Sequence, residues 1–111
     1  MSLRQGDIVL TNFNPQSGHE QAGYRPAVVV SNRIFNTYSN LTLLCPVTHT
    51  DRHSPFHVEI TGNPHVNGFI LCDQVKMIDL RARGFRKISE LDRKTLLEVL
   101  TIIQEILEPE M

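Results

Sequence analysis

The sequence predicts a mainly β fold, a small and strongly curved antiparallel barrel that carries one α-helix at its C-terminus. Five or six short apolar or alternating runs between residues 8 and 88 are separated by glycine, proline and asparagine. Residues 96–107 repeat apolar side chains at helical spacing instead. A chain of 111 residues, 41% of them hydrophobic, can bury one core, so we expect a single domain over residues 1–111.

The first half of the chain contains three predicted strands. Residues 8–13 form the first, which ends at the turn signal Asn14-Pro15, and residues 27–31 form the second. Residues 41–47 form the third, and Pro46 within it predicts an edge strand or a bulge. A helical turn is expected between the second and third strands, over residues 33–40.

The second half contains two or three more strands. Residues 57–60 alternate apolar and polar side chains and end at Gly62-Asn63-Pro64. Residues 69–78 are largely apolar and predict one long central strand, and residues 85–88 add a short one. These runs complete the sheet of the predicted barrel.

The C-terminal helix has the clearest pattern in the chain. Its apolar side chains recur at three- and four-residue steps: Leu96, Val99, Leu100, Ile103 and Leu107, widened by Ile102 and Ile106. Asp92 can cap its N-terminus, or Ser89 can do so with Asp92 as its partner. Pro109 lies just past the predicted end.

Charge is unevenly distributed along the chain. Its net charge of −1 argues against non-specific nucleic-acid binding. Residues 1–87 nevertheless carry nine Lys and Arg against six Asp and Glu, and residues 88–111 carry two against six. A basic cluster in the first part could follow a phosphate backbone, or could simply be a solvated face: Lys76, Arg81, Arg83, Arg86 and Lys87.

Several observations favour a cytoplasmic protein. No apolar stretch approaches the roughly 20 residues that cross a bilayer, and residues 1–5 lack the apolar centre of a signal peptide. Cys45 and Cys72 lie in apolar, strand-like surroundings and are interpreted as reduced core residues. We therefore expect no membrane association.

The loop over residues 18–26 is the most informative segment. It reads Gly-His-Glu-Gln-Ala-Gly-Tyr-Arg-Pro and is followed at once by an apolar strand. A polar loop held by a rigid strand suits catalysis or anion recognition, although it could also be a solvated loop. Arg25 is suited to phosphate because its planar guanidinium matches two oxygens, and Pro26 restricts its backbone to extended conformations. A structural salt bridge is the alternative for Arg25.

This loop and three further motifs resemble the MazF/PemK family of toxin endoribonucleases. The motifs are Gly6-Asp7-Ile8-Val9-Leu10, Cys45-Pro46-Val47-Thr48, and Cys72-Asp73-Gln74-Val75 followed by Arg81-Ala82-Arg83-Gly84. They occur in the family's order and spacing over nearly the whole chain. The resemblance implies an SH3-like barrel that forms a homodimer and is inhibited by a cognate, MazE-like antitoxin.

The resemblance also implies a mechanism. RNA supplies its own nucleophile, the 2′-hydroxyl, so the protein needs a base, an acid and positive charge but no metal. Arg25 and Thr48 would form the catalytic centre, while His19, Glu20 and Asp73 are candidates for proton transfer with unassigned roles. Some PemK-type members carry an arginine where this chain has Leu71, which favours the MazF-like version with Arg25 as the principal cation.

Other polar residues are candidates for RNA binding, with surface solubility as the alternative for the arginines: Gln21, Tyr24, Gln74, Lys76, Arg81, Arg83 and Arg86. His49, His53 and His57 are spaced like metal ligands on a helix, but Pro55 interrupts the run. We expect no metal and no cofactor.

The leading hypothesis is a sequence-specific, metal-independent endoribonuclease toxin that cleaves single-stranded mRNA and inhibits translation. Its products would be a 2′,3′-cyclic phosphate and a 5′-hydroxyl. One alternative is a CcdB-like toxin that binds DNA gyrase without enzymatic activity. Another is a barrel that serves only as a protein-interaction module.

Overall fold

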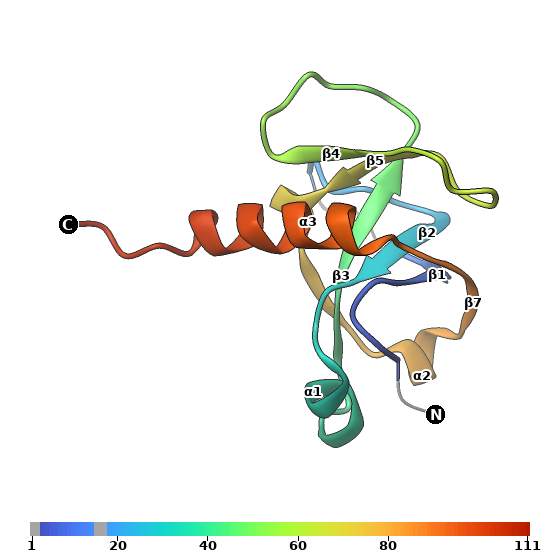
Figure 1. Cartoon of the computed structure of the whole chain (residues 1–111). Coiled ribbons are helices and arrows are strands. Elements are labelled where there is room, and N and C mark those ends of the chain that lie inside the picture. Colours follow the sequence, from blue (N-terminus) through green and yellow to red (C-terminus); the bar gives the residue numbers. More distant parts are fainter. Residues whose placement is uncertain (1–2, 15–17) are drawn as a thin grey trace.

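The structure is a computed structural model that describes residues 3–14 and 18–111, and it contains the predicted curved antiparallel sheet (Figure 1). Pro15 of the predicted turn lies outside the described residues. The strands are β1 (Asp7–Asn12), β2 (Tyr24–Val29), β3 (Thr42–Thr48), β4 (His57–Ile60), β5 (Gly68–Leu71), β6 (Lys76–Ile78) and β7 (Phe85–Glu90). Their order is β4-β5-β3-β2-β1-β7, and β6 pairs with β3 beside β5. The predicted fold class is confirmed.

The two ends of the sheet, β4 and β7, are joined by a side chain rather than by strand pairing. Asn63, in the loop after β4, donates to the carbonyl of Glu90 over 3.0 Å and accepts from Ser89 over 3.1 Å. Among the described residues the sheet is therefore barrel-like but not closed by backbone hydrogen bonds.

Three α-helices and one 3₁₀ turn accompany the strands: α1 (Arg33–Tyr38), α2 (Leu80–Arg83), α3 (Arg93–Ile106) and η1 (Cys72–Gln74). The helical turn after β2 and the C-terminal helix are confirmed, and α2 was not predicted. Asp92 is the N-cap of α3 and accepts from the Thr95 backbone N–H over 3.1 Å. Ser89, the other candidate cap, lies in β7.

Alternating side chains of the central strands bury two separate apolar clusters. One cluster packs under α3 and includes Val28, Cys45, Val47, Ile70 and Val99. The other lies on the opposite face of β2 and β3 and includes Val9, Phe13, Ala27, Leu44 and Ile78. This alternation follows from the two-residue period of a strand.

Both cysteines belong to the core, as expected. Cys45 and Cys72 are free and fully buried. A hydrogen bond with Cys72 and burial raise the pKa of the Cys45 thiol, which keeps it protonated.

The single long strand predicted over residues 69–78 is wrong. It is divided into β5, the turn η1 and β6, because the polar pair Asp73-Gln74 turns the chain between two apolar stretches. The edge position suggested by Pro46 is also wrong, because β3 pairs with β2 on one side and with β5 and β6 on the other. β3 contacts β6 through residues 42–44 and β5 through residues 47–48, so the missing N–H of Pro46 falls where the partner changes.

Within the described parts of the chain, no helix combines the length and the apolar character that a membrane span requires.

Candidate active site

Arg25 lies in β2, where it faces the end of β3. The strand begins at Tyr24, earlier than predicted, so Arg25 is a strand residue paired with Thr11 of β1. Its Nε donates to the Ala22 carbonyl over 2.9 Å and its Nη1 donates to the Val47 carbonyl over 3.2 Å. These two bonds hold the guanidinium against the residue that precedes Thr48.

Thr48 is the last residue of β3. Ala27 pairs with Pro46, and continuing this register places Arg25 opposite Thr48, with both side chains on the same face of the sheet. Thr48 is only 7% exposed, and its hydroxyl oxygen accepts from the Thr50 backbone N–H over 3.3 Å. The hydroxyl proton remains available as a donor.

The charge of Arg25 is not neutralised by a carboxylate. No ion pair involves Arg25 within the described residues, and both of its hydrogen-bond acceptors are carbonyls. Burial lowers the pKa of the Arg25 guanidinium, and the positive charge of Arg52 lowers that pKa further. Arginine nevertheless stays protonated, so this end of β2 presents positive charge with no counterion among residues 3–14 and 18–111.

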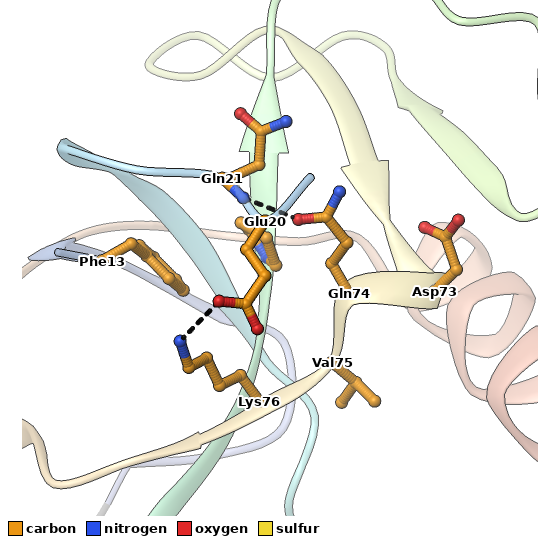
Figure 2. Close-up of a pocket in the computed structure, with 8 residues that line it drawn as sticks. Phe13, Glu20, Gln21, Asp73, Gln74, Val75 and Lys76 are labelled. Carbon is orange, nitrogen blue, oxygen red and sulfur yellow. Dashed lines mark hydrogen bonds and ion pairs between the residues drawn. The ribbon is translucent and has the colours of Figure 1, made fainter. Parts of the chain in front are cut away.

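A pocket of about 160 Å³, lined by both polar and apolar residues, lies on the same face of the sheet (Figure 2). It is lined by Phe13, Glu20, Gln21, Pro46, Asp73, Gln74, Val75 and Lys76. Pro46 precedes Thr48 by two residues in β3, so the two side chains point to the same face. The pocket and the Arg25–Thr48 pair are therefore neighbours along one strand.

Gln74 and Lys76 fix the 18–24 loop over this pocket. Gln74 Oε1 accepts from the Gln21 backbone N–H over 2.9 Å, and Gln74 Nε2 donates to the His19 carbonyl over 3.4 Å. Lys76 Nζ lies 3.7 Å from Glu20 Oε1, and Figure 2 shows this pair crossing the pocket. The loop is thus anchored to η1 and β6, far away in the sequence.

The three candidates for proton transfer have different surroundings. Glu20 and Asp73 both line the pocket, whereas the exposed His19 contacts it through its backbone carbonyl. Asp73 also bonds to His57, with 3.0 Å between Asp73 Oδ1 and His57 Nε2. The pocket therefore brings together two carboxylates, one of them paired with a lysine and the other with a histidine.

The predicted RNA-binding residues do not form one continuous surface. Gln21, Gln74 and Lys76 line the pocket, and Tyr24 is 62% exposed at the start of β2. Arg83 donates to the carbonyls of Asn12 and Asn14 and so braces the end of β1. Arg81 lies beside a different hollow, between α1 and α2, and Arg86 lies on the edge strand β7.

Four residues at or near the site were not among the predicted catalytic or RNA-binding residues. Phe13 forms an apolar wall of the pocket, Arg52 acts electrostatically on Arg25, and His57 contacts Asp73. Gly68 has a φ of +123°, and a Cβ there would lie 2.5 Å from the Thr48 carbonyl oxygen. No local pattern marks these residues, since each acts on a partner from another strand or loop.

The described residues, 3–14 and 18–111, contain no group of three or more His, Cys, Asp and Glu side chains that could hold a metal ion. His57 contacts Asp73, and His53 contacts Asp51 over 3.4 Å, so the spaced histidines have separate partners.

Known proteins resemble this chain in sequence and in structure. A family model described as "PemK-like, MazF-like toxin of type II toxin-antitoxin system" matches residues 4–107. The endoribonuclease toxin MazF of Escherichia coli (strain K12) is 43% identical over 82 residues, which cover 74% of this chain and 73% of that protein.

Two crystal structures from Deinococcus radiodurans share the fold. MazF (Form-I) superposes with a TM-score of 0.89 at 34% identity, covering 96% of this chain and 97% of the other. MazE-MazF (Form-II) superposes with a TM-score of 0.83 at 28% identity and covers 99% of each chain.

Proposed function

Because this chain belongs to the PemK-like, MazF-like toxin family and is an endoribonuclease toxin of a type II toxin–antitoxin system, we propose that it cleaves single-stranded mRNA through the 2′-hydroxyl of its substrate. The observation that carries the proposal is the position of Arg25. Its guanidinium lies beside Thr48 and has no carboxylate partner among the described residues. A scissile phosphate supplies the missing negative charge.

The reaction is an intramolecular transesterification at phosphorus. The 2′-oxygen attacks phosphorus, the bond from phosphorus to the 5′-oxygen breaks, and the products are a 2′,3′-cyclic phosphate and a 5′-hydroxyl. One proton leaves the 2′-hydroxyl and one reaches the 5′-oxygen, so a base and an acid are required. No metal is needed, because the substrate carries its own nucleophile.

The residues of the site fit distinct roles in this reaction. Arg25 stabilises the charge that develops on the phosphorane oxygens, and Thr48 donates its hydroxyl proton to one of them. Glu20 and Asp73 are the carboxylates at the pocket, and His19 is an imidazole on the same loop as Glu20. These three residues share the proton transfers.

Single-stranded RNA suits the pocket better than a duplex does. Unpaired bases can leave the stack and enter a groove, where side chains contact their edges. The pocket offers the Phe13 ring as an apolar wall and the Gln21 and Gln74 amides as hydrogen-bonding groups. We assign backbone contacts to Lys76, Tyr24 and the arginines Arg81, Arg83 and Arg86.

The biological partners follow from the same family. We propose that a MazE-like antitoxin inhibits the toxin, that the toxin is a cytoplasmic homodimer forming one domain over residues 1–111, and that free toxin inhibits translation. A structure of MazF with MazE superposes on this chain over 99% of its length, which supports an antitoxin of that kind. The related proteins are named endoribonucleases, so the gyrase-binding alternative is set aside.

The test is cleavage of a long RNA by purified protein in the presence of EDTA. We expect discrete fragments that carry a cyclic phosphate at one end and a 5′-hydroxyl at the other. Arg33→Ala is the matched control for Arg25→Ala, because Arg33 is an exposed arginine of α1, beyond the opposite end of β2. Loss of cleavage in EDTA, or normal cleavage by Arg25→Ala, would contradict this mechanism.

A further inference from the structure

His57 is almost completely buried and makes its side-chain hydrogen bond to Asp73. The His57 side chain is 6% exposed and the Asp73 side chain is 42% exposed. Their contact, 3.0 Å between His57 Nε2 and Asp73 Oδ1, joins residues 16 positions apart. The imidazole of this pair is thus buried in the protein interior, and the carboxylate is partly exposed to solvent.

The backbone on both sides of this pair is fixed. His57 begins β4 and pairs with Leu71, the last residue of β5. The Cys72 N–H donates to the Phe56 carbonyl over 3.1 Å, immediately before Asp73. The ring and the carboxylate are therefore delivered from two elements in fixed register, and neither depends on a loop for its position.

The chemistry of the two groups assigns the donor of this hydrogen bond. Because an ionised carboxylate only accepts hydrogen bonds, we assign the N–H at His57 Nε2 as the donor and Asp73 Oδ1 as the acceptor. Nδ1 is buried and has no hydrogen-bond partner within the described residues. Histidine is a costly residue for simple packing under these conditions, because an apolar side chain would leave no buried nitrogen unpaired. Among the described residues, the bond to Asp73 is the only hydrogen bond that the imidazole makes.

Only one oxygen of Asp73 is used in this way. Its Oδ2 has no hydrogen-bond partner among the described residues, and its side chain lines the pocket beside Gln74 (Figure 2). A carboxylate held at one oxygen has a fixed orientation, and its second oxygen can accept a hydrogen bond from a substrate. Glu20 differs, since it is paired with Lys76 across the same pocket.

We propose that His57 is a positioning residue for RNA cleavage: it holds the Asp73 carboxylate in one orientation so that the free oxygen faces the substrate in the pocket. The inference rests on the proposed function and assigns a residue that acts through Asp73 rather than on RNA. It requires that removing the Nε2 donor slows RNA cleavage only in a protein whose residue 73 still carries a carboxylate.

The test compares two replacements of His57 that differ in one property. His57→Gln keeps an N–H donor near the position of Nε2, and His57→Leu keeps apolar bulk without a donor. We expect His57→Leu to lower kcat/KM for a short RNA by about tenfold or more, as the loss of a charge-assisted hydrogen bond does. His57→Gln should recover most of that loss. His65→Leu, an exposed histidine in the β4–β5 loop, is the control and should cleave normally.

A double-mutant cycle with Asp73→Asn decides whether the effect passes through the carboxylate. In the Asp73→Asn background, His57→Leu should cause no further loss, so the two effects should not add. Additive effects, equal losses for Gln and Leu, or normal cleavage by Asp73→Asn would each overturn the inference. Those outcomes leave the proposed RNA cleavage at Arg25 intact provided that Arg25→Ala still abolishes cleavage, although normal cleavage by Asp73→Asn would also remove Asp73 from the proton transfers.

A spectroscopic measurement keeps the inference testable if His57→Leu does not fold. The ¹⁵N shifts of the His57 ring in the wild-type protein should report the tautomer protonated at Nε2, and Asp73→Asn should change them. A wild-type ring protonated only at Nδ1, or ring shifts unaffected by Asp73→Asn, would overturn the assignment.

Discussion

Two cationic residues of this sheet, Lys87 and Arg25, have opposite electrostatic surroundings. Lys87 in β7 lies 2.8 Å from Glu90 Oε2 and 3.2 Å from Asp7 Oδ1. These two carboxylates raise the pKa of Lys87, with Glu90 as the larger cause. Within the part of the chain that the structure describes, Arg25 in β2 hydrogen-bonds only to carbonyls, and burial together with Arg52 lowers its pKa.

The comparison distinguishes a cation that is neutralised within the protein, Lys87, from a cation that we propose binds a ligand, Arg25. At the β1–β7 edge the protein supplies its own counterions, so the cation contributes to the fold. At the β2–β3 end it supplies hydrogen-bond acceptors that orient a guanidinium without neutralising it. A guanidinium that is oriented but not neutralised can bind an external anion, and we propose that this anion is the phosphate of RNA. Four substitutions can break or sharpen this comparison.

The largest effect is expected for Arg25→Ala. It removes the cation that we propose stabilises the transition state, so kcat should fall by on the order of 10³-fold, as for the loss of an oxyanion-stabilising donor. Stability should change little, because the residue has no carboxylate to leave unpaired. Single-turnover RNA cleavage and urea unfolding measure the two quantities. A large loss of stability with normal cleavage by the folded fraction would reverse the comparison.

Gly68→Ala should impair both the fold and the candidate site. A Cβ at residue 68 would lie 2.5 Å from the Thr48 carbonyl oxygen, so β3 or β5 has to shift next to Thr48. Gly62→Ala is the matched control, since Gly62 also has a positive φ, +73°, but no atom lies within 4 Å of its added Cβ. We expect about 1–2 kcal/mol of destabilisation for Gly62→Ala from the backbone conformation alone.

Gly68→Ala should destabilise the protein more than its control, Gly62→Ala, does. It should also lower the cleavage rate of the folded protein, whereas Gly62→Ala should cleave normally. Thermal unfolding and a cleavage assay on the same preparations test this pair. Equal behaviour of the two variants would show that Thr48 tolerates displacement.

Asp7→Ala should affect the fold and leave the chemistry unchanged. Asp7 is buried and accepts from the Arg4 backbone N–H over 2.8 Å in addition to its contact with Lys87. Removing it leaves a backbone donor unpaired, which should cost roughly 1–3 kcal/mol in the free energy of unfolding. Urea denaturation measures the loss, and the cleavage rate per folded molecule should equal that of the wild type.

The smallest effect is expected for Asp92→Ala at the N-terminus of α3. Loss of an N-cap should cost about 1 kcal/mol at neutral pH. Hydrogen bonds from Thr95 lower the pKa of Asp92, so its contribution is complete above the ordinary carboxyl pKa near 3.9 and is lost as the pH falls through the lower folded-state value. Unfolding measured from pH 7 downward should show the wild type and the variant converging in acid.

Elements with local signals were predicted correctly. The Asp92 cap and the apolar stripe of α3 act over three or four residues, so adjacent side chains suffice to specify them. The division of residues 69–78 was missed because the apolar content of that stretch resembles one strand. Only the pairing of β3 with two different partners shows where the chain has to turn.

The candidate site was predictable as a set of residues but not as an arrangement. The loop at residues 18–26 and the motif Cys72-Asp73-Gln74-Val75 both reach the pocket, and their polar residues were identified. The five residues of the basic cluster, in contrast, separate into a pocket residue, a brace for β1, two separate surface positions and a lysine paired with Asp7 and Glu90: Lys76, Arg83, Arg81 with Arg86, and Lys87. Its members are close in sequence, but the sheet directs them to different faces.

The chain by itself specified composition, strand alternation, the terminal helix and the chemical types gathered in the 18–26 loop, because each depends on neighbours within a few residues. Tertiary structure alone decided that Arg25 faces Thr48, that His57 holds Asp73 and that Gly68 lies against the Thr48 backbone. These contacts join separate elements, and the register of strand pairing determines which side chains meet. One step of register would send every side chain of a strand to the other face, so no local pattern could have specified them.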